Sequence, residues 1–275
     1  MKFHWMHRFD FGNRERELVY MAKTLEKSKA YSVLLTYSFG SPDFVPFLPS
    51  MIKSTKTLKF MLALRSYTLS PEYAIRIFET MKNSYGSRLT FNLVAGKMVD
   101  HEEKEAIEMY NFDKSLINTV GKRIELADKW ADKFFGFYTK RNLKPPISYT
   151  IGNSPITLEL GNKWTDYTII HDGMVERSIN KAKNTKLVLT IDPLIRQTKE
   201  DLDGDIEYYT QSWNTNLGKK PIVIEKRNHS IRGNMEEVKQ QITDISKRYG
   251  VEDFMIVTSQ KDISSLLRLM EEMSD

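Results

Sequence analysis

Two histidines stand near the ends of short apolar runs, where acid–base chemistry could be placed. His7 lies late in the first run of the chain and His171 closes the sixth, whereas His4 lies earlier in the first run. An imidazole changes its charge near neutral pH, so such a histidine could act as a general acid or base. Because a lone histidine is more often structural, the pattern makes His7 and His171 catalytic candidates without defining a reaction. The sequence has no assignable Ser–His–Asp order and no GxxxxGK[ST] or GxGxxG motif.

The turn Gly152-Asn153-Ser154 could bind a phosphate group. It follows the apolar run Ile147–Ile151 and opens a predicted helix at Pro155. The first N–H groups of a helix and the positive end of its dipole favour an anion, and the Ser154 hydroxyl adds a donor. Spacing alone favours an ordinary helix cap at this turn.

Two further polar residues lie in or beside apolar runs. Asn92 stands inside the run Leu89–Val94, and a buried amide needs hydrogen-bond partners from a neighbouring strand, a loop or a ligand. Arg65 follows the run Leu58–Leu64, at the end of a strand where barrel enzymes place their chemistry, although a surface arginine would also fit.

The elements that would position these side chains are clearest between residues 58 and 96. Leu58–Leu64 and Leu89–Val94 are long enough for buried strands and too short for helices. Between them Ser70 can cap a helix, Pro71 can begin it and Gly86 can end it. The segment predicts two parallel strands joined by a right-handed helical crossover.

The whole chain repeats this alternation. Predicted helices include Asn13–Ser28, Leu116–Tyr138, Met174–Ala182, Met235–Tyr249 and Ile263–Met273. The sequence therefore predicts an α/β fold, most simply one (β/α)₈ TIM barrel over residues 1–275, with an open doubly wound sheet as the alternative. Between strands seven and eight, Asp201–Asn234 has little periodicity and predicts a loop-rich, lid-like insertion. The eight predicted strands are Lys2–Phe9, Ser32–Tyr37, Leu58–Leu64, Leu89–Val94, Ile147–Ile151, Tyr167–His171, Leu187–Ile191 and Phe254–Val257.

Composition narrows the class of protein. There is no cysteine, and no apolar run approaches the roughly 18 residues of a membrane span. The first residues lack the apolar core of a signal peptide, so we expect a soluble, cytoplasmic protein without a membrane partner. The formal charge of +5 is mild and spread along the chain. Nucleic-acid binding ranks last, because no stacking aromatic residues interleave the basic positions Lys219, Lys220, Lys226, Arg227 and Arg232.

The segment from Leu58 to Gly96 also carries a resemblance. LKFMLALR, Ser70-Pro71, Arg76, Thr80, Arg88 and Phe91-Asn92-Leu93-Val94 with Gly96 resemble the luciferase-like flavin monooxygenases, and most closely the alkanesulfonate monooxygenase branch. The resemblance implies a (β/α)₈ barrel that binds reduced flavin at the carboxyl ends of its strands. Weaker similarity covers most of the chain.

The resemblance also implies a cofactor site. In the family, a turn like 152–154 holds the flavin phosphate, the matching asparagine faces the flavin, and a cis peptide often precedes the matching arginine. Asp100-His101-Glu102-Glu103 is similar to a flavin-contacting loop motif, and no metal site is expected. The implied cofactor-binding residues are Ala63, Leu64, Arg65, Asn92, His101, Gly152, Asn153 and Ser154.

The sequence departs from the alkanesulfonate branch at its substrate end. The branch's cysteine after strand two is replaced by the Ser41-Pro42-Asp43 turn, and its tryptophan after strand six falls near His171. Its arginine and histidine on strand seven fall near Thr190 and Asp192, which weakens the expectation of an anionic sulfonate. Asp192 joins the two histidines as a catalytic candidate.

The function implied is a monooxygenase that uses reduced FMN, supplied by a separate flavin reductase, and O₂ to oxygenate a small organic substrate through a flavin peroxide. Deazaflavin F420 is the weaker choice of cofactor. The family resemblance further implies a homodimer. A divergent flavin-binding relative without this activity is the alternative, since much of the branch's catalytic set is missing.

Overall fold

The computed structural model describes residues 1–8, 15–36, 43–95, 115, 118–152, 154–198, 200–202, 231–257 and 263–274. For residues 7 and 8 only the backbone is described. Residues 96–114, which include the predicted flavin-contacting motif at 100–103, lie outside this set, as does most of the predicted insertion 201–234.

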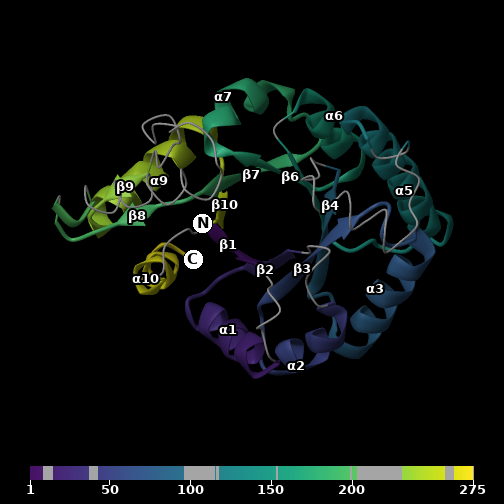
Figure 1. The fold of residues 1–275 in the computed structure, drawn as a ribbon, viewed down its shortest axis with the longest axis horizontal. Coiled ribbons are helices and arrows are strands. Elements are labelled where there is room, and N and C mark those ends of the chain that lie inside the picture. The colour runs from purple at the N-terminus through teal and green to yellow at the C-terminus, as the bar shows by residue number, and fades with distance from the viewer. Residues whose placement is uncertain are drawn as a thin grey trace.

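Eight parallel strands form a closed barrel (Figure 1), as the sequence predicts. Around the barrel the order is β1-β10-β7-β6-β5-β4-β3-β2, so the first and last strands of the chain pair with each other. The open-sheet alternative is therefore wrong. The strands are β1 (Lys2–Arg8), β2 (Ser32–Thr36), β3 (Lys59–Arg65), β4 (Leu89–Val94), β5 (Ser148–Ile151), β6 (Tyr167–His171), β7 (Lys186–Ile191) and β10 (Asp253–Ile256).

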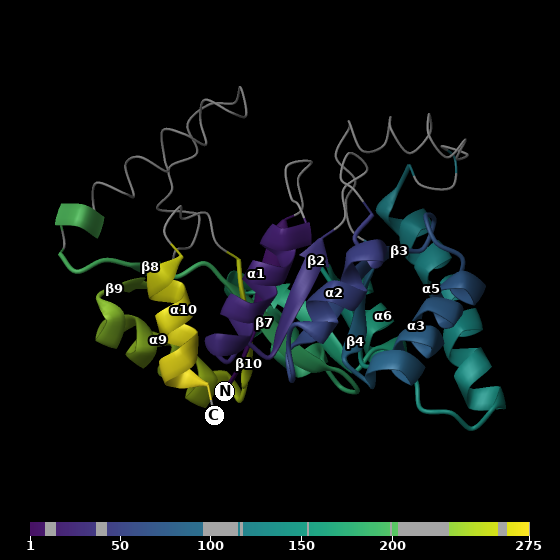
Figure 2. The same ribbon diagram turned by 90° about the horizontal axis from the view of Figure 1, so that it is seen from below.

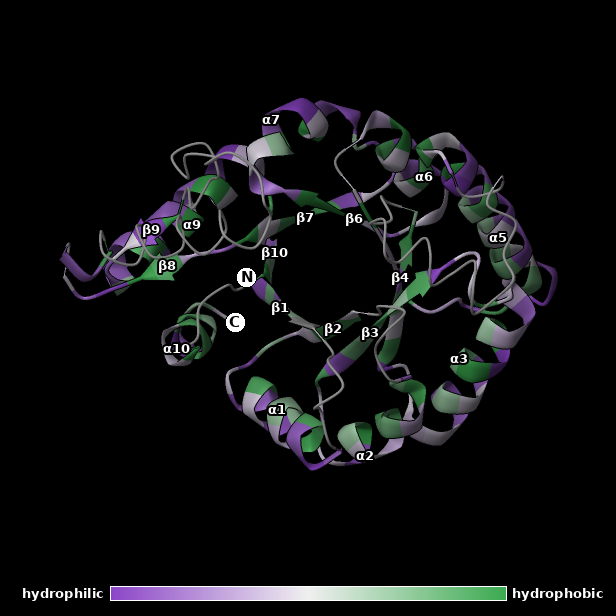
Figure 3. Cartoon of the chain, in the orientation of Figure 1, coloured by the Kyte–Doolittle hydropathy of each residue, from purple (hydrophilic) through white to green (hydrophobic). Residues whose placement is uncertain are grey.

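Helices surround the barrel (Figure 1). Figure 3 shows that they carry apolar stripes beside polar ones, which is typical of helices packed on one side only. They are α1 (Glu15–Lys27), α2 (Leu48–Lys53), α3 (Pro71–Tyr85), α5 (Val120–Lys140), α6 (Pro155–Trp164), α7 (Val175–Ser178), α9 (Met235–Tyr249) and α10 (Ser264–Met273). Short 3₁₀ turns are η1 (Val45–Phe47), η3 (Asp172–Met174) and η4 (Ile179–Lys181).

Local sequence explains the ends of α3. The Ser70 side chain accepts a hydrogen bond from the Tyr73 N–H, and Pro71 occupies the first helical position. Gly86 ends the helix with a φ of +75°, a conformation that strains other residues. The predicted cap, first residue and stop of this helix are all confirmed.

The strands separate two cores because their side chains alternate between two faces. Phe91 and Leu93 of β4 point outward and join the large cluster between barrel and helices. Met61, Tyr149 and Met255 belong to a smaller cluster inside the barrel. Residues that alternate with the outward ones, Asn92 among them, therefore face the interior.

The amino-terminal end of the barrel is closed by a polar cluster. His4 of β1 is fully buried, with its Nδ1 2.7 Å from Ser32 Oγ and its Nε2 3.2 Å from Asp253 Oδ1. A neutral imidazole with its proton on Nε2 satisfies both contacts, donating to the carboxylate and accepting from the hydroxyl. The cluster ties β1 to both of its neighbours, β2 and β10.

Some boundaries differ from the sequence predictions. The predicted helix Met174–Ala182 is a series of short turns, η3, α7 and η4, and α7 lacks a side-chain cap. α5 begins at Val120, where Thr119 caps it, rather than at Leu116. An unpredicted parallel pair, β8 (Leu194–Ile195) and β9 (Arg232–Gly233), lies outside the barrel beside α9 (Figure 2).

Two further observations concern the described part of the chain. All of its peptide bonds are trans, so the cis bond expected around Ala63–Leu64 is not present. It contains no helix that is both long and apolar enough to span a membrane.

The close contact between Gly161 of α6 and Thr168 of β6 predicts that adding one methyl group at Gly161 strongly lowers stability. A Cβ at Gly161 would lie 2.0 Å from Thr168 Oγ1, so Gly161→Ala should overpack this contact and destabilise the protein by about 1–3 kcal/mol. Gly136 of α5 has no atom near the corresponding position, so Gly136→Ala should stabilise by up to about 1 kcal/mol. Urea unfolding of both variants measures the two changes; equal effects would contradict this packing.

Candidate functional site

The candidate site lies at the carboxyl ends of the barrel strands. Arg65, Val94 and His171 are the last residues of β3, β4 and β6. Because all eight strands are parallel, these residues stand at one rim of the barrel, and Asp192 directly follows β7 at the same rim. In the strand order β3 and β7 are four places apart, so Arg65 and Asp192 approach the rim from opposite sides.

Asn92 is the most informative residue of the site. It pairs with Ala63 of β3 and Tyr149 of β5, and it faces the interior in the carboxyl half of β4. The residue is 1% exposed, and its Oδ1 atom is buried without a hydrogen-bond partner among the described residues. An unpaired buried carbonyl oxygen costs about 1–3 kcal/mol, so the site has a built acceptor that a ligand N–H can satisfy.

Arg65 is held by its own neighbours. It is 9% exposed, and its Nη1 donates a hydrogen bond of 2.8 Å to Tyr67 Oη. Its backbone oxygen accepts from the N–H and hydroxyl of Thr68. The bond to Tyr67 holds the guanidinium at the rim, beside the strand that carries Asn92. The simple reading of Arg65 as a surface residue is wrong.

His171 and Asp192 have different environments. His171 is exposed and caps the turn η3, with its Nδ1 3.2 Å from Gly173 N and 2.8 Å from Asp172 Oδ1. Asp192 has a buried Oδ1 atom. Thr190, which pairs with His171, uses its hydroxyl to bond Ile170 O of β6. The histidine thus has a structural role as a cap, while its exposure leaves it open to solvent and solutes.

The turn from Gly152 to Ser154 joins β5 to α6. Ser154 caps α6, accepting from Thr157 N at 3.2 Å and lying 2.8 Å from Thr157 Oγ1. Pro155 has no N–H and Thr157 N is used by the cap, so Ile156 N–H is the remaining donor of the first turn. Gly152 has a φ of +156°, and a Cβ there would lie 2.7 Å from Thr157 Cγ2. Backbone conformation and packing therefore both require glycine.

Replacing Ser154 tests the phosphate hypothesis. Ser154→Ala should destabilise α6 by about 1 kcal/mol through the lost cap, and should also weaken FMN roughly tenfold through the lost hydroxyl. Riboflavin, which has no phosphate, should lose little. Parallel titrations with both flavins measure the difference.

A matched control exists in α3. Ser70 caps that helix in the same way and also precedes a proline. Ser70→Ala should therefore lower stability without changing the FMN-to-riboflavin affinity ratio. Equal losses of both flavins in Ser154→Ala would place the phosphate elsewhere.

The structure brings only part of the predicted set together. Ala63, Leu64, Arg65 and Asn92 lie on the paired strands β3 and β4. Leu64 packs in the outer core, so its side chain is turned away from the interior. His101 and Asn153 lie outside the described residues, and for His7 only the backbone in β1 is described, where it pairs with Leu35.

Two contributors were missed by the sequence analysis. The Thr157 hydroxyl forms a hydrogen bond with that of Ser154, and the Tyr67 hydroxyl accepts one from Arg65. Thr157 stands at the third position after a serine cap, a place where side chains commonly complete a cap, so its spacing was a usable signal. Tyr67 follows the end of β3 in a segment without periodicity, so its role could not be predicted from the sequence.

Comparison with known proteins supports the fold alone. No protein-family model matches the sequence, and no curated protein matches it. Among solved structures, riboflavin lyase (RcaE) with modified FMN and riboflavin is similar, with a TM-score of 0.74, 11% identity and coverage of 98% of this chain and 89% of that one.

Two other solved structures are similar over nearly their whole length. An F420-dependent secondary alcohol dehydrogenase, in complex with an F420-acetone adduct, has a TM-score of 0.72 and 11% identity, covering 98% of this chain and 97% of that one. EDTA monooxygenase (EmoA) from Chelativorans sp. BNC1 has a TM-score of 0.72 and 11% identity, covering 100% and 94%. At this identity they share the architecture of the barrel, not its residues.

Proposed function

We propose that this chain is a flavin-dependent monooxygenase of the luciferase-like type, which binds reduced FMN at the carboxyl end of its barrel. The observation that carries the proposal is the Oδ1 atom of Asn92 on the inner face of β4, which is buried and has no hydrogen-bond partner within the described part of the chain. The barrel shared with proteins named for FMN, F420 and monooxygenase activity supports it.

The residues at the rim fit a flavin. An isoalloxazine ring presents N–H groups and carbonyl oxygens, which match the Asn92 oxygen and the Arg65 cation respectively. The phosphate would lie at the Gly152–Ser154 turn, near the positive end of α6. Ala63 of β3, which pairs with Asn92, has a small and partly exposed side chain, and a flat ring would lie against it.

When bound, reduced flavin supplies the reaction with O₂, and the protein supplies binding, orientation and electrostatics. Asn92 would hold the ring beside β4 by accepting a hydrogen bond from it. Arg65 would offset the negative charge of the reduced ring. The barrel interior below the site is filled by Leu34, Met61 and Val188, so water has no route through the barrel from its amino-terminal end.

At the rim near His171 and Asp192, where the substrate would lie, a neutral or donor-bearing organic molecule is favoured over a sulfonate. Asp192, beyond the end of β7, would repel an anion placed beside it. His171 and Asp192 are the acid–base groups that we assign to this end. FMN is preferred to F420 on the resemblance of 58–96, and a separate reductase and a homodimer belong to the same proposal.

Coupled turnover tests this function. With a flavin reductase, FMN and a panel of small organic compounds, substrate-dependent O₂ uptake with an oxygenated product is expected. The second candidate is a flavin-binding protein without oxygenase activity, which the missing branch residues favour. Saturable flavin binding with no substrate-dependent product across the panel would favour that second candidate.

A further inference from the structure

One face of the barrel is strongly basic. Because the barrel strands are all parallel, the helices end and the strands begin at the amino-terminal face, opposite the candidate flavin site. Of the helices that the structure describes, all except α10 have a lysine or arginine in the last turn. Figure 2 shows this face along the lower side of the molecule, where both termini also lie.

The charge of this face can be counted over the connections that lead from a helix into the next barrel strand. Each connection is taken from the last four helical residues through the first residue of the strand. Together they contain 17 lysine and arginine residues against 5 aspartate and glutamate residues. The formal charge of the whole chain is only +5, so the rest of the chain is net negative. The connections are 24–32, 50–59, 82–89, 137–148, 161–167, 175–186 and 246–253.

Helix dipoles explain only part of this excess. A cation in the last turn of a helix offsets the negative end of the dipole, and the effect fades beyond that turn. Lys144 lies past the end of α5, and Lys183 and Lys186 lie past the end of η4, yet all three are exposed cations. Within the described part of the chain, Lys144 and Lys183 form no ion pair, whereas Lys163 pairs with Asp128 at 2.8 Å.

An apolar side chain stands among the cations. Leu143 is 41% exposed, and it lies in the connection from α5 to β5 between the exposed residues Arg141 and Lys144. A leucine beside two cations can enter the apolar edge of a bilayer while the charged groups stay among the lipid headgroups.

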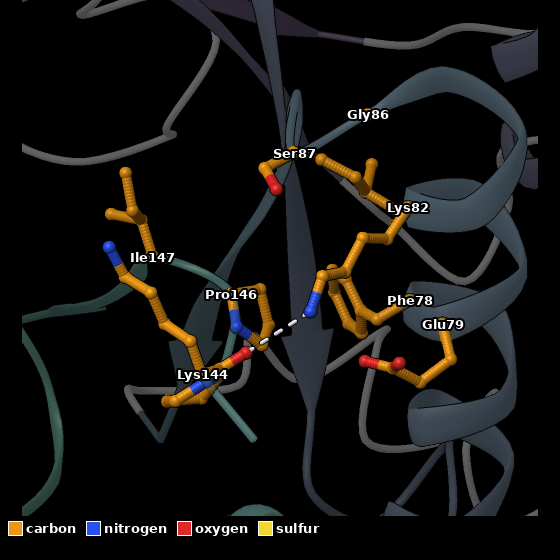
Figure 4. A pocket seen from close by; sticks show the side chains of 10 residues that line it. Phe78, Glu79, Lys82, Gly86, Ser87, Lys144, Pro146 and Ile147 are labelled. Carbon is orange, nitrogen blue, oxygen red and sulfur yellow. Dashed lines mark hydrogen bonds between the residues drawn. The ribbon is translucent and has the colours of Figure 1, made fainter.

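The turn that presents Leu143 is well fixed. Asn142 has a φ of +53°, and the Leu143 N–H donates a hydrogen bond of 2.9 Å to the Tyr138 backbone oxygen. Lys82 Nζ of α3 donates a long hydrogen bond of 3.5 Å to the Lys144 backbone oxygen (Figure 4). Two prolines with fixed φ angles follow. The exposure of Leu143 therefore belongs to an ordered turn, and binding would need little further ordering.

A flat anionic surface fits this face better than a nucleic acid does. The cations surround most of the barrel, so a bilayer meets them together, whereas a duplex is a narrow rod that meets only adjacent connections. Single strands bind largely through bases stacked on open aromatic rings. Phe137 and Trp164 pack on the core, and Arg141 and Lys163 lie over their rings at 4.0 and 5.0 Å from the centroids. These rings are not open to bases.

We propose that the amino-terminal face of the barrel binds the surface of a bilayer that contains anionic phospholipids. The cations of the connections would meet the lipid phosphates, Leu143 would enter the edge of the acyl region, and the candidate flavin site would face the water. The side of α10, whose last turn carries Glu271 and Glu272 and no cation, would tilt away from the lipid. The proposal goes beyond the proposed function and does not depend on it.

The sequence analysis expected no membrane partner because the connections are spread along the chain and meet only in the fold. Vesicle sedimentation of the full-length protein tests the surface. At about 0.1 M KCl, we expect binding to vesicles with about 30% phosphatidylglycerol in phosphatidylcholine and none to pure phosphatidylcholine. Binding should be lost at about 0.5 M KCl, because salt screens exposed charges. No binding to the anionic vesicles, equal binding to both kinds, or tighter binding to RNA than to vesicles would overturn the proposal.

Paired charge removals test the placement. Arg141→Gln with Lys144→Gln should weaken binding to the anionic vesicles about 25-fold, since each cation near such a surface contributes about fivefold. Arg16→Gln with Lys122→Gln removes the same charge from exposed positions in the first turns of α1 and α5, at the other end of the barrel. This control should bind nearly as the wild type does, and thermal melts verify that both are folded. Equal losses would overturn the placement.

A single dye tests the contact of Leu143 with lipid. The chain has no cysteine, so Leu143→Cys provides one attachment site for an environment-sensitive dye such as NBD. Its emission should brighten and shift to shorter wavelength with anionic vesicles, because the dye enters an apolar region. The same dye on Arg16→Cys should not respond. No response at position 143, or equal responses at both positions, would contradict the proposed orientation.

Discussion

Replacing His4 by leucine should destabilise the protein by about 3–5 kcal/mol, the usual cost of removing one partner from a buried polar pair. Leucine fills much of the volume but leaves the Asp253 carboxylate and the Ser32 hydroxyl without the contacts of 3.2 and 2.7 Å that they make with the imidazole. The lost contacts lie where β1 pairs with β10, the strand pair that closes the barrel, so the substitution weakens barrel closure directly. Urea unfolding at pH 7.5 measures the change.

The same residue makes stability depend on pH. Burial lowers the pKa of His4 below its ordinary value of 6.5, with the hydrogen bond to Asp253 opposing the shift and the charges of Lys2 and Lys59 adding to it. As the pH falls below 6.5, the unfolded chain binds a proton that the folded chain does not. The free energy of unfolding should therefore decrease by up to about 1.4 kcal/mol per pH unit until the folded-state pKa is reached.

One variant isolates this contribution. His4→Gln keeps polar atoms in the cluster and removes the titration, so the difference in slope from the wild type between pH 6.5 and 5 should report His4 alone. An unchanged slope in His4→Gln would mean that His4 titrates equally in the folded and unfolded states.

Asn92→Val should change stability and flavin affinity in opposite directions. The Oδ1 atom is buried and has no partner among the residues that the structure describes, so an apolar residue of similar size should leave the protein as stable or more stable. The lost hydrogen bond should weaken flavin binding by about tenfold. Thermal unfolding and flavin fluorescence titration on one preparation measure both.

Thr90→Val provides the matched control on the same face of β4. Thr90 is 1% exposed, and its hydroxyl bonds the Phe60 backbone oxygen at 3.5 Å, two positions nearer the amino end of the strand. We expect reduced stability and unchanged flavin affinity in this variant. A parallel loss of stability and affinity in Asn92→Val would identify the asparagine as structural.

The strands could be predicted because each is a short apolar run between breakers. β4 and β6 have the predicted bounds, and β3 differs by one residue at each end. β8 and β9 could not be predicted, since strands of two residues carry no periodicity. The stretch 174–182 folds as short turns where one helix was expected.

The candidate site could be predicted only where chemistry is visible locally. Asn92 stood out as an amide in an apolar run, and Gly152 as a glycine before a helix. The His4 cluster joins residues that are 28 and 249 positions apart in the chain, so spacing gave no signal.

The central claim is that the carboxyl end of this barrel binds reduced flavin through Asn92 and the Gly152–Ser154 turn. Anaerobic equilibrium dialysis of reduced FMN against the wild type, Asn92→Val and Ser154→Ala tests it most directly. The account predicts one saturable FMN per wild-type chain and weaker binding in both variants. Absence of saturable binding to the wild type, or equal binding by all three proteins, would contradict it.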